Sequence, residues 1–392
     1  MSTFFKSSAN APNRLASRRA RRSSGNMNDA RPLADLTLVE AALRCAPASV
    51  HRLFASTPSP APGTGAPSPT AAAAPPSAPL PIPRAHPSLP PSLSSPRPRV
   101  LRTPSPHDKA AMTDEIHALW VKGAIAREYD PDVPSVDPPT RPARDERVVL
   151  VEPGRAPRLG KGGSPESRVA ILHSLAHIES WAIDLSWDIV ARFGAARSMP
   201  RAFFDDFVQV AADEARHFRM LAARLVELGS EYGALNAHDG LWDSAMETAG
   251  SLEARLVVEH CVHEARGLDV LPATIEKFRR NGDEQSAQLL EGTIYPEEVT
   301  HCAAGVRWFK YLHERDGGER RTKGGAGGGE GEGGEAGSGE EAVARAFHET
   351  VWAHFKGVLK PPFNEEARDR AGFGRAWYMP LTKRPAVAGA GA

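Results

Sequence analysis

The sequence is poor in cysteine: Cys45, Cys261 and Cys302 are the three in 392 residues, and they lie far apart. Thiols so few and scattered suit a reducing compartment and provide neither a disulfide framework nor a cysteine-based zinc site. The chain has no run of about 18 apolar residues, so we expect no membrane span. Basic and acidic residues both number 48. This balance gives no whole-chain electrostatic reason to expect nucleic acid or a membrane surface as a partner.

Acidic residues are missing from the first 28 positions, which carry six basic residues and six serines. Such a composition resembles an organellar transit peptide, and a disordered basic tail accounts for it equally well. We therefore expect a cytoplasmic or organellar protein, not a secreted one.

Strand-like alternation of any length is also missing, and two segments cannot pack a core. Residues 54–106 hold 17 of the 35 prolines, and residues 317–341 consist largely of glycine and glutamate. Both compositions predict disordered insertions. We expect seven successive parts: a basic tail or transit peptide (1–34), an N-terminal helix (35–53), a disordered insertion (54–106), a helical extension and loop (107–160), the main helical part (161–316), a disordered loop (317–341), and a C-terminal helix and tail (342–392).

The main helical part shows continuous 3.6-residue apolar periodicity, and the fold class is therefore all-α. Serine, proline, asparagine and glycine signals predict four long helices, over residues 166–194, 200–229, 241–281 and 283–315. Pro272 and Pro296 are expected to kink or bend the last two. Shorter flanking helices are expected at 35–52, 107–127 and 342–358.

Two Glu-x-x-His motifs, Glu214–His217 and Glu298–His301, fall on the second and fourth long helices. This spacing places both side chains on one helix face, one turn apart. Di-metal carboxylate bundles need two such motifs and one further glutamate from each remaining helix. An internal repeat selects Glu179 and Glu264, because they precede the motif glutamates by 35 and 34 residues. Glu259 would break that spacing.

The helix faces support a buried site. Apolar residues stack around Glu179 (Leu172, Leu175, Ala176, Ala182, Ile183 and Trp187) and around Glu214 (Phe207, Val210, Ala211, Phe218 and Leu221). Buried carboxylates are strongly destabilising unless they are neutralised. Two divalent metal ions would achieve this. The alternative is a purely structural salt-bridge network with Arg216, Arg266 or other basic residues, which is less consistent with six residues in symmetric spacing.

At these residues the sequence resembles a ferritin-like family of unknown function. The resemblance rests on His177–Leu185, Asp213–Phe218, His238–Trp242, Glu264–Val270 and Pro361–Asn364. It implies a ferritin-like four-helix bundle with flanking helices, and a di-metal ligand set of Glu179, Glu214, His217, Glu264, Glu298 and His301. It implies no activity. A more distant resemblance, to di-iron hydroxylases that modify tRNA, is an analogy of fold.

Further side chains are expected near the site without binding metal: His260, Glu259, Glu297, Asp184 and Asp269. The first suits a polar core position, and the two glutamates are expected to face solvent or neighbouring helices. The two aspartates suit hydrogen bonds around the site or between helices, with Arg216 and Arg266 as possible partners.

The leading functional hypothesis is an O₂-dependent di-metal oxidoreductase acting on an unknown substrate. Carboxylate-rich ligands with two histidines favour iron, with manganese as the alternative. No electron-transfer domain is evident, so a separate reductase would be needed. Two alternatives stay open: a non-catalytic ferritin-like metal-binding or stress protein, and a tRNA-modifying hydroxylase-like protein tethered to RNA by its basic N-terminus.

Overall fold

The computed structural model describes residues 100–129, 137–323 and 339–384, apart from the side chains of 317–323. Within them the chain is all-helical, with no β-strand, which confirms the predicted class. The expected tail, the helix at 35–52 and most of the proline-rich insertion lie outside the described residues. In the described part, no helix combines the length and apolar character needed to span a membrane.

The first of two helical hairpins is formed by α3 (Pro165–Ile189) and α4 (Arg201–Glu227), which pack along each other. The Ser164 hydroxyl caps α3 by accepting a hydrogen bond from the Ser167 amide, as the sequence predicts. A π-helical segment, η4 (Val190–Gly194), continues α3. Gly229, with φ of +75°, follows the end of α4. Both expected helices are therefore present, with nearly the expected ends.

The second hairpin is less regular. Its first arm consists of α6 (Leu252–Val257), π-helical η5 (Val258–His263) and α7 (Glu264–Arg280). Its second arm consists of α8 (Glu284–Leu289), π-helical η6 (Leu290–Ile294) and α9 (Tyr295–Lys323).

The single helix expected at 241–281 is a misprediction, because α5 (Gly240–Glu247) is separate. The chain restarts at Ser251, whose hydroxyl caps α6 by accepting from the Ala254 amide. Helix α7 continues through Pro272. Helix α9 runs beyond residue 316, the end expected for the main helical part.

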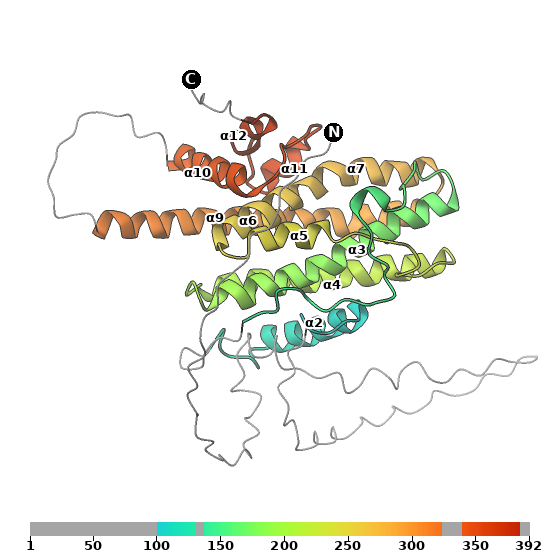
Figure 1. Cartoon of the computed structure of the whole chain (residues 1–392), viewed down its shortest axis with the longest axis horizontal. Coiled ribbons are helices and arrows are strands. Elements are labelled where there is room, and N and C mark those ends of the chain that lie inside the picture. Colours follow the sequence, from blue (N-terminus) through green and yellow to red (C-terminus); the bar gives the residue numbers. More distant parts are fainter. Residues whose placement is uncertain (1–99, 130–136, 324–338, 385–392) are drawn as a thin grey trace, which may run out of the picture.

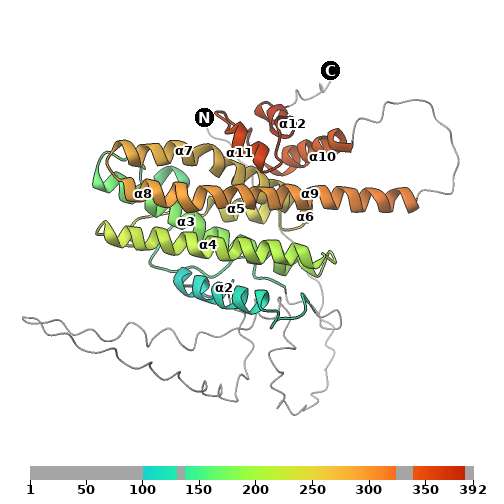
Figure 2. The same ribbon diagram turned by 180° about the vertical axis from the view of Figure 1, so that it is seen from behind.

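The two hairpins lie side by side, and shorter helices cover opposite sides of them (Figures 1 and 2). On one side α2 (Pro106–Val121) packs against α4. On the other, α10 (Gly339–His354), α11 (Glu365–Arg370) and α12 (Arg375–Tyr378) cover the second hairpin. Helix α5 contacts both α3 and η5. Short 3₁₀ turns, η3 (Pro153–Arg155) and η7 (Met379–Thr382), complete the described elements.

Buried ion pairs link the flanking segments to two aspartates of the hairpins. Each of these aspartates follows a candidate metal glutamate by five residues in the sequence. Asp184 of α3 receives Lys109 of α2 at 2.6 Å and Arg144 at 2.7 Å. Asp269 of α7 receives Arg368 of α11 at 2.6 Å. The expected bonding between helices is thus present, but Arg216 is not a partner of either aspartate and pairs elsewhere. Arg266 only approaches Asp269, at 3.9 Å.

Candidate metal centre

Six buried or partly buried side chains from four helices meet between the two hairpins. Within one group, Glu179 of α3 joins Glu214 and His217 of α4 and Glu298 of α9. In a second group, Glu264 of α7 and His301 of α9 join the same Glu214 and Glu298. The candidate ligand atoms of each group lie within 4.8 Å of one another. All six residues selected from the sequence are therefore brought together; we call them the carboxylate–histidine cluster.

Both histidines turn Nδ1 toward the shared carboxylates. His217 Nδ1 lies 3.3 Å from Glu214 Oε2, 3.6 Å from Glu298 Oε1 and 3.8 Å from Glu179 Oε2. His301 Nδ1 lies 3.0 Å from Glu214 Oε1 and 3.9 Å from Glu298 Oε1. Within the described residues, the ion pairs of Glu179, Glu214 and Glu298 are all with these two histidines, so arginine does not neutralise them.

Three polar atoms at the centre of the cluster are buried without a hydrogen-bond partner among the described residues: Nδ1 of His217, Nδ1 of His301 and Oε2 of Glu214. An unsatisfied buried polar atom costs about 1–3 kcal/mol, more when charged. Imidazole nitrogen and carboxylate oxygen are ordinary ligands of divalent transition metals. The unsatisfied atoms therefore fit a site that could hold metal ions.

The pKa values describe how protons are shared without metal. Burial, reinforced by the charge of Glu214, raises the pKa of Glu179 to about 8. Burial and Glu214 likewise raise the pKa of Glu264 to about 7. The same two causes raise the pKa of Glu298 well above its usual value. In Glu214 itself burial acts upward, but His301 and His217 outweigh it and hold the pKa well below 4.5.

The two histidines of the cluster are also protonated more readily than free histidine. Burial lowers their pKa, but the surrounding carboxylates outweigh it and raise the pKa of His217 and His301 well above 6.5. Protons thus occupy the positions that cations would take, and metal binding would release them.

Two further acidic residues, Asp213 and Glu297, form a layer around the cluster. They orient its histidines by contacting Nε2, the ring nitrogen opposite the one that faces the shared carboxylates. His217 Nε2 lies 2.7 Å from Glu297 Oε2, and Arg216 also reaches that oxygen, at 2.5 Å. His301 Nε2 lies 3.4 Å from Asp213 Oδ2, while Gln209 donates to the other oxygen of Asp213 at 2.9 Å. A carboxylate behind a histidine fixes the ring and its tautomer, and so directs the other nitrogen at the metal.

Sequence reasoning missed this layer, although a signal was present. Asp213 and Glu297 each stand directly before the first residue of a Glu-x-x-His motif. Glu297 was expected to face solvent or a neighbouring helix, and it contacts both His217 and Arg216. The repeated acid before each motif therefore marks the residues that orient the histidines.

The remaining candidates have simpler surroundings. His260 is buried with its ring centroid 4.8 Å from that of Phe207, and burial lowers its pKa to about 3. It therefore has the expected core position. Glu259 was expected to face solvent or neighbouring helices; it is 1% exposed, and so belongs to the interior.

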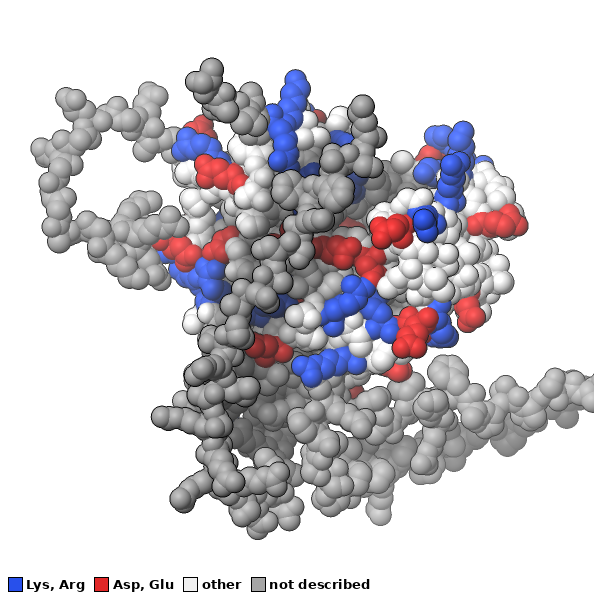
Figure 3. Space-filling model, viewed as in Figure 1, with Lys and Arg blue, Asp and Glu red and all other residues white. Residues whose placement is uncertain are grey.

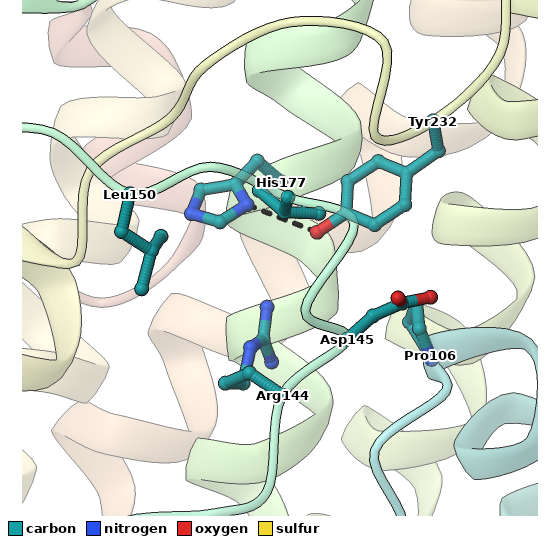
Figure 4. Close-up of a pocket in the computed structure, with 7 residues that line it drawn as sticks. Pro106, Arg144, Asp145, Leu150, His177 and Tyr232 are labelled. Carbon is teal, nitrogen blue, oxygen red and sulfur yellow. Dashed lines mark hydrogen bonds between the residues drawn. The ribbon is translucent and has the colours of Figure 1, made fainter.

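A small pocket lies beside α3, apart from the cluster (Figure 4). It is lined by Pro106, Arg144, Asp145, Val148, Leu150, His177 and Tyr232, none of them a cluster residue. His177 Nδ1 and the Tyr232 hydroxyl are 3.0 Å apart, as the dashed line in Figure 4 shows. The pocket has room for about one water molecule, which suits a structural role better than substrate binding.

These observations define an all-helical protein whose buried glutamates and histidines could hold metal ions. Residues 102–379 match a family described as "Protein of unknown function (DUF455)", and the chain belongs to that family. A relative in Haemophilus influenzae, described as "Uncharacterized protein", is 29% identical over 278 residues, covering 70% of this chain and 88% of the relative. No solved structure matches.

Proposed function

We propose that this protein is a ferritin-like four-helix bundle that holds two divalent metal ions and uses them as an O₂-dependent oxidoreductase. The observation that carries the proposal is the pair of ligand groups sharing Glu214 and Glu298. Two adjacent groups with common carboxylates are what two bridged metal ions require. The four helices that supply the ligands belong to two paired hairpins, as in such bundles.

Charge supports two cations rather than one. Four carboxylates face two imidazoles in the cluster. With both imidazoles neutral, as metal ligation requires, four negative charges remain, and two divalent ions balance them. Oxygen-rich ligation with two nitrogens favours iron, with manganese as the alternative, over zinc or copper.

The residues of the protein would bind the metal ions, orient the ligand side chains and shield the site from solvent. Glu214 and Glu298 would bridge the two ions, while Glu179 with His217 and Glu264 with His301 would complete one ion each. Asp213 and Glu297 hold the histidine rings in place. Bound iron would supply the chemistry of O₂ activation. Glu264 is the one partly buried residue of the six, so we place the approach of small molecules on its side of the cluster. A separate reductase would deliver electrons.

The described residues on the face drawn in Figure 3 give no comparable support for a nucleic-acid substrate. On the face drawn in Figure 3, lysine and arginine are interspersed with aspartate and glutamate. Nucleic-acid binding relies on concentrated positive charge that neutralises phosphates. We therefore do not extend the proposal to tRNA.

The test is metal content per chain in protein produced with iron and manganese available. The wild type is expected to bind two ions per chain, and a Glu214→Ala, Glu298→Ala variant to bind none. Glu276→Ala, which removes an exposed glutamate of α7, is the matched control and should keep both ions.

O₂ uptake after anaerobic reduction then separates the functional hypotheses. Rapid uptake by the wild type, absent in the double variant, supports an oxidoreductase. Two bound ions without O₂ uptake would favour a metal-binding or stress protein instead. A wild type that binds no metal would rule out the proposal.

A further inference from the structure

Glu259 is a buried carboxylate that the cluster does not use. It lies in η5, its side chain is fully buried, and neither of its oxygens makes a hydrogen bond within the described residues. A carboxylate in this position is costly unless it takes up a proton or a cation. Its burial without partners calls for an explanation.

The charge of Arg255 acts to lower the pKa of Glu259, but the hydrogen bonds of its guanidinium go to other residues. Arg255 donates to Asp188 at 2.5 Å, to the Thr248 hydroxyl at 2.9 Å and to the Ala245 carbonyl at 2.7 Å. These bonds hold Arg255 between α3 and the end of α5. Among the described residues, the ion pair of Glu259 is therefore with His263 alone, at 3.9 Å and only when that histidine is protonated.

The π-helical geometry of η5 brings Glu259 to the inside. In an α-helix, residues five apart are separated by about 140° around the axis. A π-helical turn closes between residues i and i+5, which brings such residues closer to the same face. Glu259 precedes Glu264 by five residues, across η5. Burial and the charge of Glu214 are the main causes of the raised pKa of Glu264, and the charge of Glu259 adds a smaller contribution.

Two neighbouring side chains, His263 and Ser244, carry further atoms that could bind a cation. His263 Nε2 lies 3.9 Å from Glu259 Oε2, and the Ser244 hydroxyl of α5 lies 3.2 Å from the same nitrogen. The His263 side chain is 32% exposed, whereas that of Glu259 is 0% exposed. The three side chains thus lie where α5 contacts η5, and His263 directly precedes Glu264 in the chain.

We infer that Glu259, His263 and Ser244 form a loading site that receives a divalent cation from solvent and passes it to the carboxylate–histidine cluster. This inference rests on the proposed function. One carboxylate, one imidazole and one hydroxyl, completed by water, suit iron or manganese. A single carboxylate holds the ion weakly, and the four carboxylates of the cluster then attract it inward. The transfer changes neither the oxidation state of the ion nor any covalent bond.

The experiment follows Co²⁺ binding to the metal-free full chain, because coordination changes its visible absorption. The variants are Glu259→Gln and Ser244→Ala, with Glu276→Gln as the exposed control. Glu259→Gln should still bind two ions at equilibrium but load them at least about tenfold more slowly, since a buried negative charge in a cleft raises cation on-rates by at least that factor. Ser244→Ala should slow loading less.

Thermal unfolding distinguishes loss of the site from damage to the fold. Glu259 loses no hydrogen bond on replacement by glutamine, so Glu259→Gln should unfold at the wild-type temperature or above. Loading at the wild-type rate in Glu259→Gln, with two ions still bound, would overturn the inference and leave the di-metal proposal standing.

Removing the cluster tests the loading site directly. A purified Glu214→Ala, Glu298→Ala chain should carry no metal, but titration with excess Co²⁺ should show one weak binding site, and adding Glu259→Gln should abolish it. A cluster variant without this weak Co²⁺ site contradicts the loading site. A wild type that binds no Co²⁺ contradicts the proposed function as well, so the two failures are distinguishable.

Discussion

The two hairpins carry the same pattern of residues on backbones that differ. Each supplies one glutamate, one Glu-x-x-His motif, an acid directly before that motif and a buried aspartate five residues after the first glutamate. In the first hairpin the helices are α-helical through their ligands. In the second, η5 ends directly before Glu264, and η6 ends four residues before Glu298.

Neither hairpin supplies all the residues of the site. Asp213 of the first hairpin orients His301 of the second, and Glu297 of the second orients His217 of the first. Each candidate ion would also take ligands from both hairpins. Metal binding should therefore stabilise the docking of one hairpin on the other, since a ligand that binds only the assembled state favours it. The π-helical turns η5 and η6 precede ligands in the second hairpin only, whereas η4 of the first hairpin follows its ligand, and η5 carries Glu259.

The largest expected effect is a difference in metal stoichiometry between shared and unshared ligands. Glu214→Ala should lose both ions, because Glu214 belongs to both groups. Glu179→Ala and Glu264→Ala should each keep one, because each belongs to one group. Elemental analysis of purified protein measures this, with Glu166→Ala and Glu276→Ala as controls for α3 and α7. Equal losses in all three variants would show that the cluster does not divide into two ligand groups.

The next effect concerns the ion pairs that fasten the flanking helices. Arg368→Met leaves Asp269 buried without its main cation and should lower the free energy of unfolding by about 3–5 kcal/mol. Lys109→Met should cost less, because Arg144 still pairs with Asp184. Denaturant unfolding measures both, with exposed Arg370→Met and Lys122→Met as controls. A larger loss in Lys109→Met would mean that Arg144 is no substitute for it.

A smaller effect is expected from the acids behind the histidines. Glu297→Gln and Asp213→Asn keep the shape of each side chain and remove its charge. Replacing such orienting groups typically weakens metal binding about 10- to 100-fold. Glu297→Gln should have the larger effect, because its contact with histidine is 2.7 Å against 3.4 Å for Asp213. Competition with a chelator measures the affinities, and Glu291→Gln is an exposed control. Unchanged affinity in both variants would make this layer structural only.

The sequence was sufficient for the helical class and for the residues that meet in the cluster, and the reason is physical. Helical periodicity and caps are local, and the three-residue spacing of Glu214 and His217 fixes their common face. The repeat then selected Glu179 and Glu264 without tertiary information. That these residues bind metal stays a prediction.

Most features that sequence reasoning missed depend on backbone detail or on tertiary contacts. A π-helical turn has no composition signal of its own, so Glu259 was not expected in the interior. The break before Ser251 had a local signal that was overlooked, because a glycine followed by a capping serine (Gly250 and Ser251) is typical of one helix ending and another beginning. The partners of Asp184 and Asp269 come from Lys109, Arg144 and Arg368, far away in sequence, which local spacing cannot identify.

The smallest effect is a pH dependence of stability that only the metal-free protein should show. Burial raises the pKa of Glu179, in the first hairpin, from 4.5 to about 8, and that of Glu264, in the second, to about 7. A group whose pKa is raised by folding binds more protons in the folded state. Its stabilising contribution is complete below pH 4.5 and is lost as the pH rises through its folded value.

The free energy of unfolding of the metal-free protein should therefore fall as the pH rises from about 6.5 to about 8. Below about pH 6.5 the buried His173, His177 and His260 oppose this slope, because burial lowers their pKa values to about 4, 3 and 3. Glu214 has a lowered pKa and acts in the opposite direction, but only as the pH falls through that lowered value, below this window. Bound metal displaces the protons, so metal-loaded protein should lose this slope, while its metal affinity rises with pH. Denaturant unfolding across this range, with and without chelator, measures the slope. Glu264→Gln should remove the part near pH 7 and Glu179→Gln the part near pH 8. A metal-free protein whose stability is flat or rises across the window would show that the buried glutamates are ionised and neutralised in another way.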